Sequence, residues 1–187
     1  MTDLIFSHDA IILDACCVIN LYASKQIEVI LDAIPKSVCI AAYVKDEEIL
    51  RIYDISTNRT EDIDLKPLID KSILVLVYLN LETEAETHVN LATVLDDGEA
   101  VTGAIAYHRN WAIATDDNAA IKVFKREAPH LQIITTPELI KYWADNNNPP
   151  PEVVKQCLQN ITVGARYHPS KKNPLYNWWQ SYLVTDD

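Results

Sequence analysis

The chain has 187 residues, an apolar content of 49% and a formal net charge of −11. This length favours a single domain, and the apolar content excludes a disordered chain. No apolar run is long enough to span a membrane, and the N-terminus lacks the basic, apolar pattern of a signal peptide. We therefore expect a cytoplasmic protein with no membrane partner.

The negative charge is concentrated in the larger part of the chain. Residues 149–187 hold four basic and three acidic residues, so residues 1–148 carry 12 basic against 24 acidic residues. A protein that binds nucleic acid through its overall field is usually basic. Either the partner is not a polyanion, or part of the negative charge forms a site for a cation.

The first predicted strand is the apolar run Ala10 to Leu13, which ends in the carboxylate of Asp14. Four apolar residues in a row are typical of a parallel strand buried on both faces. Helices are predicted over 15–23 and 25–34, the second ended by Pro35. Asp14 is explained either as the cap of the first helix or as part of a ligand crevice at the end of the strand.

The remaining chain alternates between apolar strands and helices. Short strands are predicted at 38–41, 72–79, 111–115 and 131–135. Helices are predicted at 43–53, from a capping box at Thr83 to about 95, from Asp96 to about 110, at 118–126, and after a cap at Thr136 with Pro137 in first position. Residues 54–70 have no clear period, and we interpret them as a loop with a short helix.

This order predicts a three-layer α/β/α domain with a central parallel sheet over residues 1–148. Residues 146–151, Asn-Asn-Asn-Pro-Pro-Pro, form a stiff linker. A C-terminal extension, 149–187, follows with a helix at 152–159 and an irregular aromatic segment. We expect Trp178 or Trp179 to anchor this tail on the domain or on a dimer mate, with Lys171 and Lys172 exposed.

The four cysteines, Cys16, Cys17, Cys39 and Cys157, show no zinc-ligand spacing, and we interpret them as small buried thiols. Carboxylates, in contrast, recur at the ends of elements. Asp14 and the pair Asp116 and Asp117 follow two strands, and helix-borne Glu48 and Glu99 can face the same edge. Such acids repel one another unless a cation lies among them, and oxygen-only ligands suit Mg²⁺ and Mn²⁺.

The order of these acids resembles the PIN-domain ribonucleases, which include VapC-type toxins. The matching stretches are Leu13 to Leu21, Glu48 to Leu50, Leu95 to Ala100 and Ala114 to Ala120. The resemblance covers roughly residues 10–145, and the third stretch is similar to the branch of the family that carries Gly-Glu there. The second stretch matches most loosely, and its register does not separate Glu47 from Glu48.

The resemblance implies a metal-dependent ribonuclease that uses Mg²⁺ or Mn²⁺. The implied metal-binding carboxylates are Asp14, Glu48, Glu99 and Asp117, with Asp116 as a fifth candidate. Asn20 matches the polar residue that orients the first acid, and Thr115 matches the hydroxyl beside the last one. Thr115, Lys171 and Lys172 are the candidate substrate-binding residues.

The implied partners are an RNA substrate, an antitoxin protein if the chain is a toxin, and a second copy in a homodimer. A PIN-like protein-binding module without catalysis is the alternative function, with the tail aromatics as its surface. A phosphatase-type hydrolase ranks third, because Cys16 stands where that chemistry usually has a second Asp.

Overall fold

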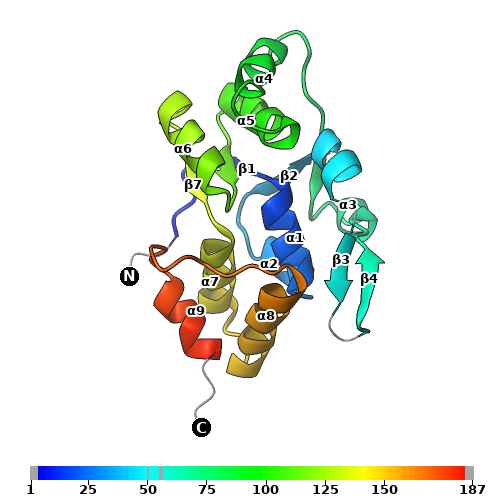
Figure 1. The fold of residues 1–187 in the computed structure, drawn as a ribbon, viewed down its shortest axis with the longest axis vertical. Coiled ribbons are helices and arrows are strands. Elements are labelled where there is room, and N and C mark those ends of the chain that lie inside the picture. The colour runs from blue at the N-terminus through cyan, green and yellow to red at the C-terminus, as the bar shows by residue number, and fades with distance from the viewer. Residues whose placement is uncertain (1–3, 50, 55–56, 184–187) are drawn as a thin grey trace.

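The computed structural model describes residues 4–49, 51–54 and 57–183, and Leu50 of the second matching stretch lies outside them. Its centre is a parallel sheet in the order β5-β2-β1-β6-β7 (Figure 1). The strands are β1 (Ala10–Leu13), β2 (Ser37–Ala41), β5 (Val75–Val77), β6 (Ala112–Ala114) and β7 (Ile133–Ile134). β1 lies in the middle and is buried along its whole length, as its apolar run predicts.

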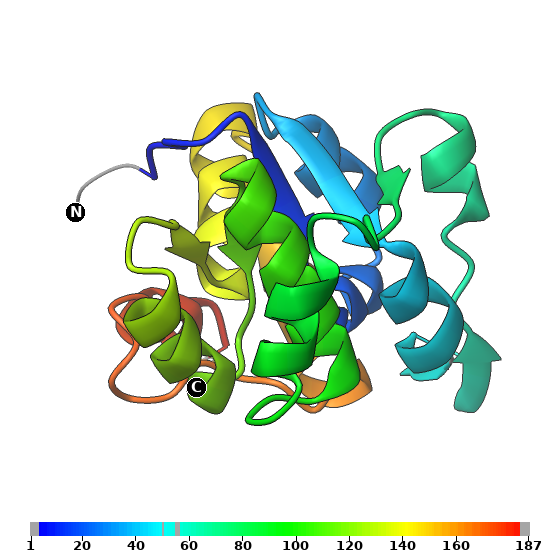
Figure 2. The same ribbon diagram turned by 90° about the horizontal axis from the view of Figure 1, so that it is seen from above.

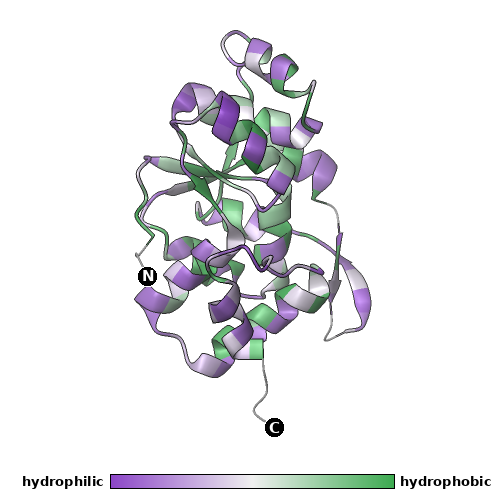
Figure 3. Ribbon diagram, turned by 60° about the vertical axis from the view of Figure 1, so that its left-hand side comes forward, coloured by the Kyte–Doolittle hydropathy of each residue, from purple (hydrophilic) through white to green (hydrophobic). Residues whose placement is uncertain are grey.

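Helices cover both faces of the sheet, which confirms the predicted three-layer α/β fold (Figures 1 and 2). On one side lie α4 (Ala85–Leu91), α5 (Asp97–Arg109) and α6 (Asn118–Glu127). On the other lie α1 (Ala15–Ala23), α2 (Ile27–Asp32) and α7 (Thr136–Asn147), with α8 (Pro151–Gly164) and α9 (Tyr176–Leu183) beyond them. The hydropathy colouring places apolar residues on the strands and on the helix faces that meet them (Figure 3).

The predicted helix at 43–53 is wrong. Its first half is a single π-helical turn, η1 (Val44–Glu48), closed by a bond from the Ile49 amide to the Val44 carbonyl at 3.1 Å. The chain then enters β3 (Arg51–Asp54), which pairs antiparallel with β4 (Arg59–Asp62). Side chains in β3 alternate between exposed and buried, the period of a strand rather than of a helix. The predicted loop at 54–70 therefore contains β4, followed by α3 (Lys66–Asp70).

The edge strand and the start of α4 also differ from the sequence prediction. The strand expected over 72–79 is only three residues long, since β5 is the edge strand and pairs with β2 alone. The capping box expected at Thr83 does not form, because Glu84 is the N-cap of α4 and its carboxylate pairs with Arg109 at 2.7 Å.

The C-terminal extension packs against the domain. α8 lies against α1 and contributes Val154, Leu158 and Ile161 to the same hydrophobic core as the sheet. The aromatic segment forms the helix α9, where the sequence predicted irregular structure, and its Trp179 is fully buried against Tyr167. The expected linker is a short turn in which Asn148 adopts a left-handed conformation (φ 46°) and ends α7.

Among the described residues, none of the helices combines the length and apolar character that crossing a lipid bilayer requires.

Candidate functional site

The sheet reverses its strand order between β1 and β6, and this is where the candidate site lies. From β1 the chain continues through β2 to β5, whereas β6 and β7 lie on the opposite side. Ligands of open α/β sheets bind at the carboxyl ends of the two strands that flank such a reversal. Asp14 follows β1, and its amide donates to the Ala114 carbonyl at the end of β6 at 3.0 Å. The two strands thus bring Asp14 next to Thr115, Asp116 and Asp117.

Asp14 caps α1 and also makes contacts beyond that helix. Its Oδ1 accepts from the Ala15 amide at 2.9 Å, which caps α1. Its Oδ2 accepts from the Thr115 hydroxyl at 2.9 Å and from the Cys16 thiol at 3.1 Å. Only 4% of the residue is exposed, and this burial raises the pKa of the carboxyl. Asp14 is therefore a rigidly held, desolvated acid.

Glu48 reaches the same place through a close approach to Gly98. The Gly98 amide donates to the Glu48 carboxylate, and a Cβ on Gly98 would overlap that carboxylate. Burial raises the pKa of Glu48, and the nearby charges of Asp96 and Asp14 raise it further. Glu47, in contrast, is exposed. Of the two glutamates that the sequence did not separate, Glu48 is the one that faces the other acids.

Glu99 occupies the first turn of α5. Asp96 caps this helix through a bond from the Glu99 amide to its Oδ1 at 2.8 Å, and the Glu99 carboxylate in turn accepts from the Asp96 amide. Burial and the charges of Asp96, Asp14 and Asp117 raise the pKa of Glu99 to about 7. Since these neighbours come from different parts of the chain, the acids converge at one edge of the sheet.

Asp116 and Asp117 point in different directions. Asp117 caps α6, with its Oδ1 accepting from the amides of Ala119 and Ala120 at 2.7 and 2.8 Å, and its charge acts on Glu99. The carboxylate of Asp116 lies between α1, α7 and the tail. It accepts from Asn20, from the amide and hydroxyl of Thr136, and from the Tyr167 hydroxyl. Asp117 thus lies with Glu99 and Asp14, whereas Asp116 joins a separate polar network.

Of the two polar residues implied to support the acids, Thr115 lies beside the last acid as expected, whereas Asn20 does not lie beside the first. Asn20 does not contact Asp14; its Nδ2 donates to Asp116 Oδ2 at 2.9 Å, so it orients the other acid. Thr115 is fully buried, so its hydroxyl is turned toward the acids and not toward solvent. Its hydroxyl donates to Asp14 and accepts from the Asp117 amide at 3.2 Å, and so ties the first acid to the last.

The tail reaches the site through Tyr167 rather than through its lysines. The Tyr167 hydroxyl donates to Asp116 Oδ1 at 2.9 Å, and burial raises the pKa of this tyrosine. Lys171 and Lys172 are exposed in the turn before α9. Tyr167 was not among the predicted site residues, and no local motif distinguishes it from the other tyrosines of the tail.

Asp96 is the other residue that the sequence prediction missed. Together with burial, the negative charge of Asp96 raises the pKa of both Glu48 and Glu99. Its spacing from Glu99, Asp-Asp-Gly-Glu, fits the reciprocal pattern of a helix N-terminus, with a capping residue three positions before a glutamate. That signal identifies Asp96 as a cap, but only the fold brings it to the site.

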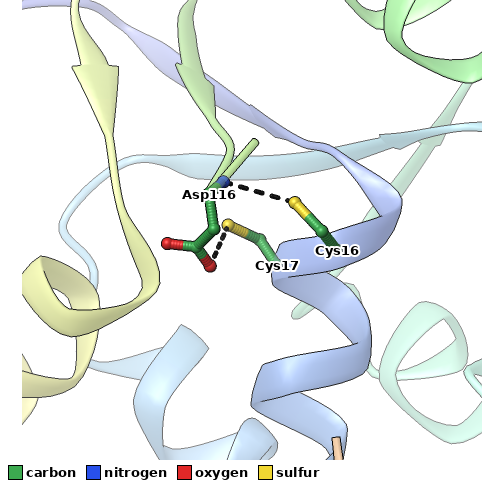
Figure 4. A group of neighbouring side chains, drawn as sticks. All are labelled: Cys16, Cys17 and Asp116. Atoms are coloured by element: carbon green, nitrogen blue, oxygen red, sulfur yellow. Dashed lines mark hydrogen bonds between the residues drawn. The ribbon is translucent and has the colours of Figure 1, made fainter. Parts of the chain in front are cut away.

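The tightest group of metal-ligand atoms lies beside these acids (Figure 4). One atom each of Cys16, Cys17 and Asp116 lies within 4.8 Å of the other two, the only such trio of His, Cys, Asp or Glu in the described part of the chain. The acids Asp14, Glu48, Glu99 and Asp117 are more widely spaced, as expected for like charges. The site therefore offers an all-oxygen set and, next to it, a sulfur-containing set.

Comparison with known protein families finds no family that matches this chain, and comparison with curated proteins finds no match either.

Proposed function

We propose that the chain is a metal-dependent endoribonuclease that hydrolyses RNA phosphodiester bonds, as its resemblance to PIN-domain proteins implies. The observation that carries this proposal is the convergence of Asp14, Glu48, Glu99 and Asp117 at the carboxyl ends of β1 and β6. Burial and the charges of Asp96, Asp14 and Asp117 together raise the pKa of Glu99 to about 7. Structural carboxylates in a fold are normally dispersed or paired with cations, so this arrangement favours a binding role.

The residues fit a hard divalent cation. Asp14, Glu48, Glu99 and Asp117 offer only carboxylate oxygens, the donors that Mg²⁺ and Mn²⁺ prefer. Gly98 has no side chain, and the Glu48 carboxylate occupies the space that the side chain of any larger residue would fill. These four residues would hold Mg²⁺ or Mn²⁺ as the cofactor, which would supply a Lewis acid for the phosphate and a water of lowered pKa.

The chain's own residues prepare the acids for this chemistry. Thr115 and the Ala15 amide fix both oxygens of Asp14, and the Gly98 amide fixes Glu48. Asp117 is held by the first amides of α6. Because each carboxylate is oriented by a backbone or buried donor, the set is preorganised, which is the main requirement of electrostatic catalysis.

The proposal is tested by cleavage of a single-stranded RNA oligonucleotide in the presence of Mn²⁺. The variants Asp14→Asn and Glu99→Gln should each lose at least about 100-fold in rate, the size of effect that follows loss of a key electrostatic group. The exposed Asp32, at the end of α2, provides the matched control Asp32→Asn, which should cleave normally. Parental activity in Asp14→Asn would exclude this site.

A second candidate is a protein-binding module without catalysis. Exposed apolar side chains on and around α4 and α5 favour it: Tyr78, Leu81, Val89, Val94 and Tyr107. Exposed apolar groups of this kind mark interaction surfaces when they are contiguous. The two functions are compatible if the partner is an antitoxin or a second copy in a homodimer. RNA cleavage by the isolated chain distinguishes the enzyme from the module.

We also propose a cytoplasmic location. All four cysteines are free, including the neighbours Cys16 and Cys17. Free thiols in a protein with several cysteines are typical of a reducing compartment.

A further inference from the structure

Two adjacent thiols lie against the Asp116 carboxylate at the start of α1. The Cys17 thiol lies 3.5 Å from Asp116 Oδ2, and the Asp116 amide donates to the Cys16 sulfur at 3.3 Å (Figure 4). Both cysteines come from the first turns of α1, and Asp116 comes from the end of β6, 99 residues beyond Cys17. The fold thus assembles a local S₂O donor set from two separate elements.

The third ligand is already oriented for binding. Asn20 and Thr136 hold Asp116 Oδ2, while Tyr167 and the Thr136 amide hold Oδ1. Outer hydrogen bonds of this type orient metal-binding carboxylates and strengthen their sites. Asp116 therefore has the support that a metal ligand needs, although the all-oxygen set does not include it.

We propose that Cys16, Cys17 and Asp116 bind a thiophilic divalent cation of the Zn²⁺ class, separately from the hard-cation site. Two sulfurs and one oxygen within 4.8 Å of one another match the donors of zinc, and three protein ligands leave a fourth position for water. Cys16 is half-buried, which provides an entry route, whereas Cys17 is fully buried.

Neither a disulfide nor simple core packing accounts for the thiol pair. Both thiols are free, so no disulfide joins them. Core packing would account for the burial of Cys17. It would not account for the hydrogen bonds that the two thiols donate, from Cys16 to Asp14 and from Cys17 to Asp116. Cys39 and Cys157 are buried core thiols outside this group, and Cys157 hydrogen-bonds to Ser24.

The two sites are linked through Cys16. Its thiol donates to Asp14 Oδ2 at 3.1 Å, so a cation that takes up the sulfur removes one of the bonds that hold Asp14. We expect Zn²⁺ to weaken the binding of Mn²⁺ by the acids. This coupling rests on the proposed function, whereas the thiophilic site itself does not.

The test uses Cd²⁺, which reports sulfur ligands through a thiolate-to-metal charge-transfer band in the ultraviolet. Titration of the reduced full-length protein should give one such band that saturates at one Cd²⁺ per chain and is displaced by Zn²⁺. Cys16→Ser and Cys17→Ala should each weaken binding at least about 100-fold, beyond the usual effect of losing an outer-sphere partner. Cys16→Ser keeps a donor to Asp14, so it remains a usable variant if Cys17→Ala fails to fold.

Matched variants separate this proposal from the proposed function. Cys39→Ala and Cys157→Ala should leave the Cd²⁺ band unchanged. Glu99→Gln should weaken Mn²⁺ binding, as measured by calorimetry, and leave Cd²⁺ binding intact. Absence of the band, or an unchanged band in Cys16→Ser, would overturn the thiophilic site. A normal band in a protein that neither binds Mn²⁺ nor cleaves RNA would reject the ribonuclease while leaving this site standing.

Discussion

Gly98 is the position where a single methyl group decides the geometry of the site. It lies in the first turn of α5, where alanine would ordinarily stabilise a helix by up to about 1 kcal/mol. Here an added Cβ would overlap the Glu48 carboxylate. We predict that Gly98→Ala lowers the melting temperature and weakens Mn²⁺ binding, because Glu48 must leave its place.

A second substitution identifies the cause. In a Glu48→Ala background the overlap no longer exists, so Gly98→Ala should become neutral or stabilising. A double-mutant cycle of urea unfolding measures this change of sign. An equal penalty in both backgrounds would show that the need for Gly98 does not come from Glu48.

Glu99 should make stability depend on pH. Its pKa rises from 4.5 to about 7 in the fold, so between these values the folded state binds more protons than the unfolded chain. Stability should therefore fall as the pH rises from 4.5 to about 7, with no further loss above. Since Glu99 is only partly buried, we expect a loss of about 1–2 kcal/mol rather than the full value of the shift.

The variant Glu99→Gln checks this dependence. Glutamine can still accept the bond from the Asp96 amide but carries no charge. Thermal unfolding without divalent cations between pH 4.5 and 8 should show a smaller decline for Glu99→Gln than for the parent. Identical pH profiles would mean that the fold does not raise the pKa of Glu99.

The sequence identified most of the acids but not where their side chains point. Asp14 and Asp117 were noted after strands and Glu48 and Glu99 on helices, the resemblance to PIN-domain proteins joined the four, and the fold brings them together. Asp116 and Asp117 could not be separated, because the outcome depends on donors from distant elements, Asn20 and Tyr167 among them. The same long-range contacts explain why Asn20 was assigned to the wrong acid.

The elements were predicted well where local pattern and tertiary environment agree. β1 and α1 have the predicted bounds, since an apolar run and an aspartate cap mark them clearly. The segment from Tyr43 onward was mistaken for a helix because Val44, Glu48 and Ile52 have helical spacing. In the fold, Ile52 instead belongs to a strand that pairs with β4, a partner that local spacing does not reveal.

Helix α9 is held by one tryptophan. Trp179 is fully buried and contacts Tyr167 edge-to-face, with ring centres 5.9 Å apart. Trp178 is only half-buried, over Lys141. We predict that Trp179→Ala costs about 3–5 kcal/mol, and Trp178→Ala clearly less. For a chain of this size the larger loss corresponds to roughly 10 °C in melting temperature.

These two substitutions are a sharper test of the tail than its removal. Truncation after Asn148 would also strip Val154, Leu158 and Ile161 from the core, so it would not isolate the role of α9. Equal effects of Trp178→Ala and Trp179→Ala on thermal unfolding would contradict the anchoring role of Trp179.

Under the proposed ribonuclease function, the net charge of −11 limits how RNA can be attracted. A polyanion is repelled by the overall field, so RNA recruitment under this proposal depends on local positive charge and on the proposed cation. Lys171 and Lys172 are exposed, next to each other, on the segment that also brings Tyr167 to Asp116. They are therefore the candidate contacts for the RNA backbone.

We predict that Lys171→Glu combined with Lys172→Glu weakens RNA binding at least about tenfold, since two phosphate contacts are lost and two repulsions gained. Lys66→Glu combined with Lys71→Glu changes the net charge equally, at two exposed lysines at the two ends of α3. If local charge governs recruitment, the tail pair should raise the KM for RNA much more than the α3 pair. The salt dependence of binding should also become shallower in the tail variant only. Equal effects of the two pairs would show that the overall field controls RNA binding and that the tail lysines have no special place in it.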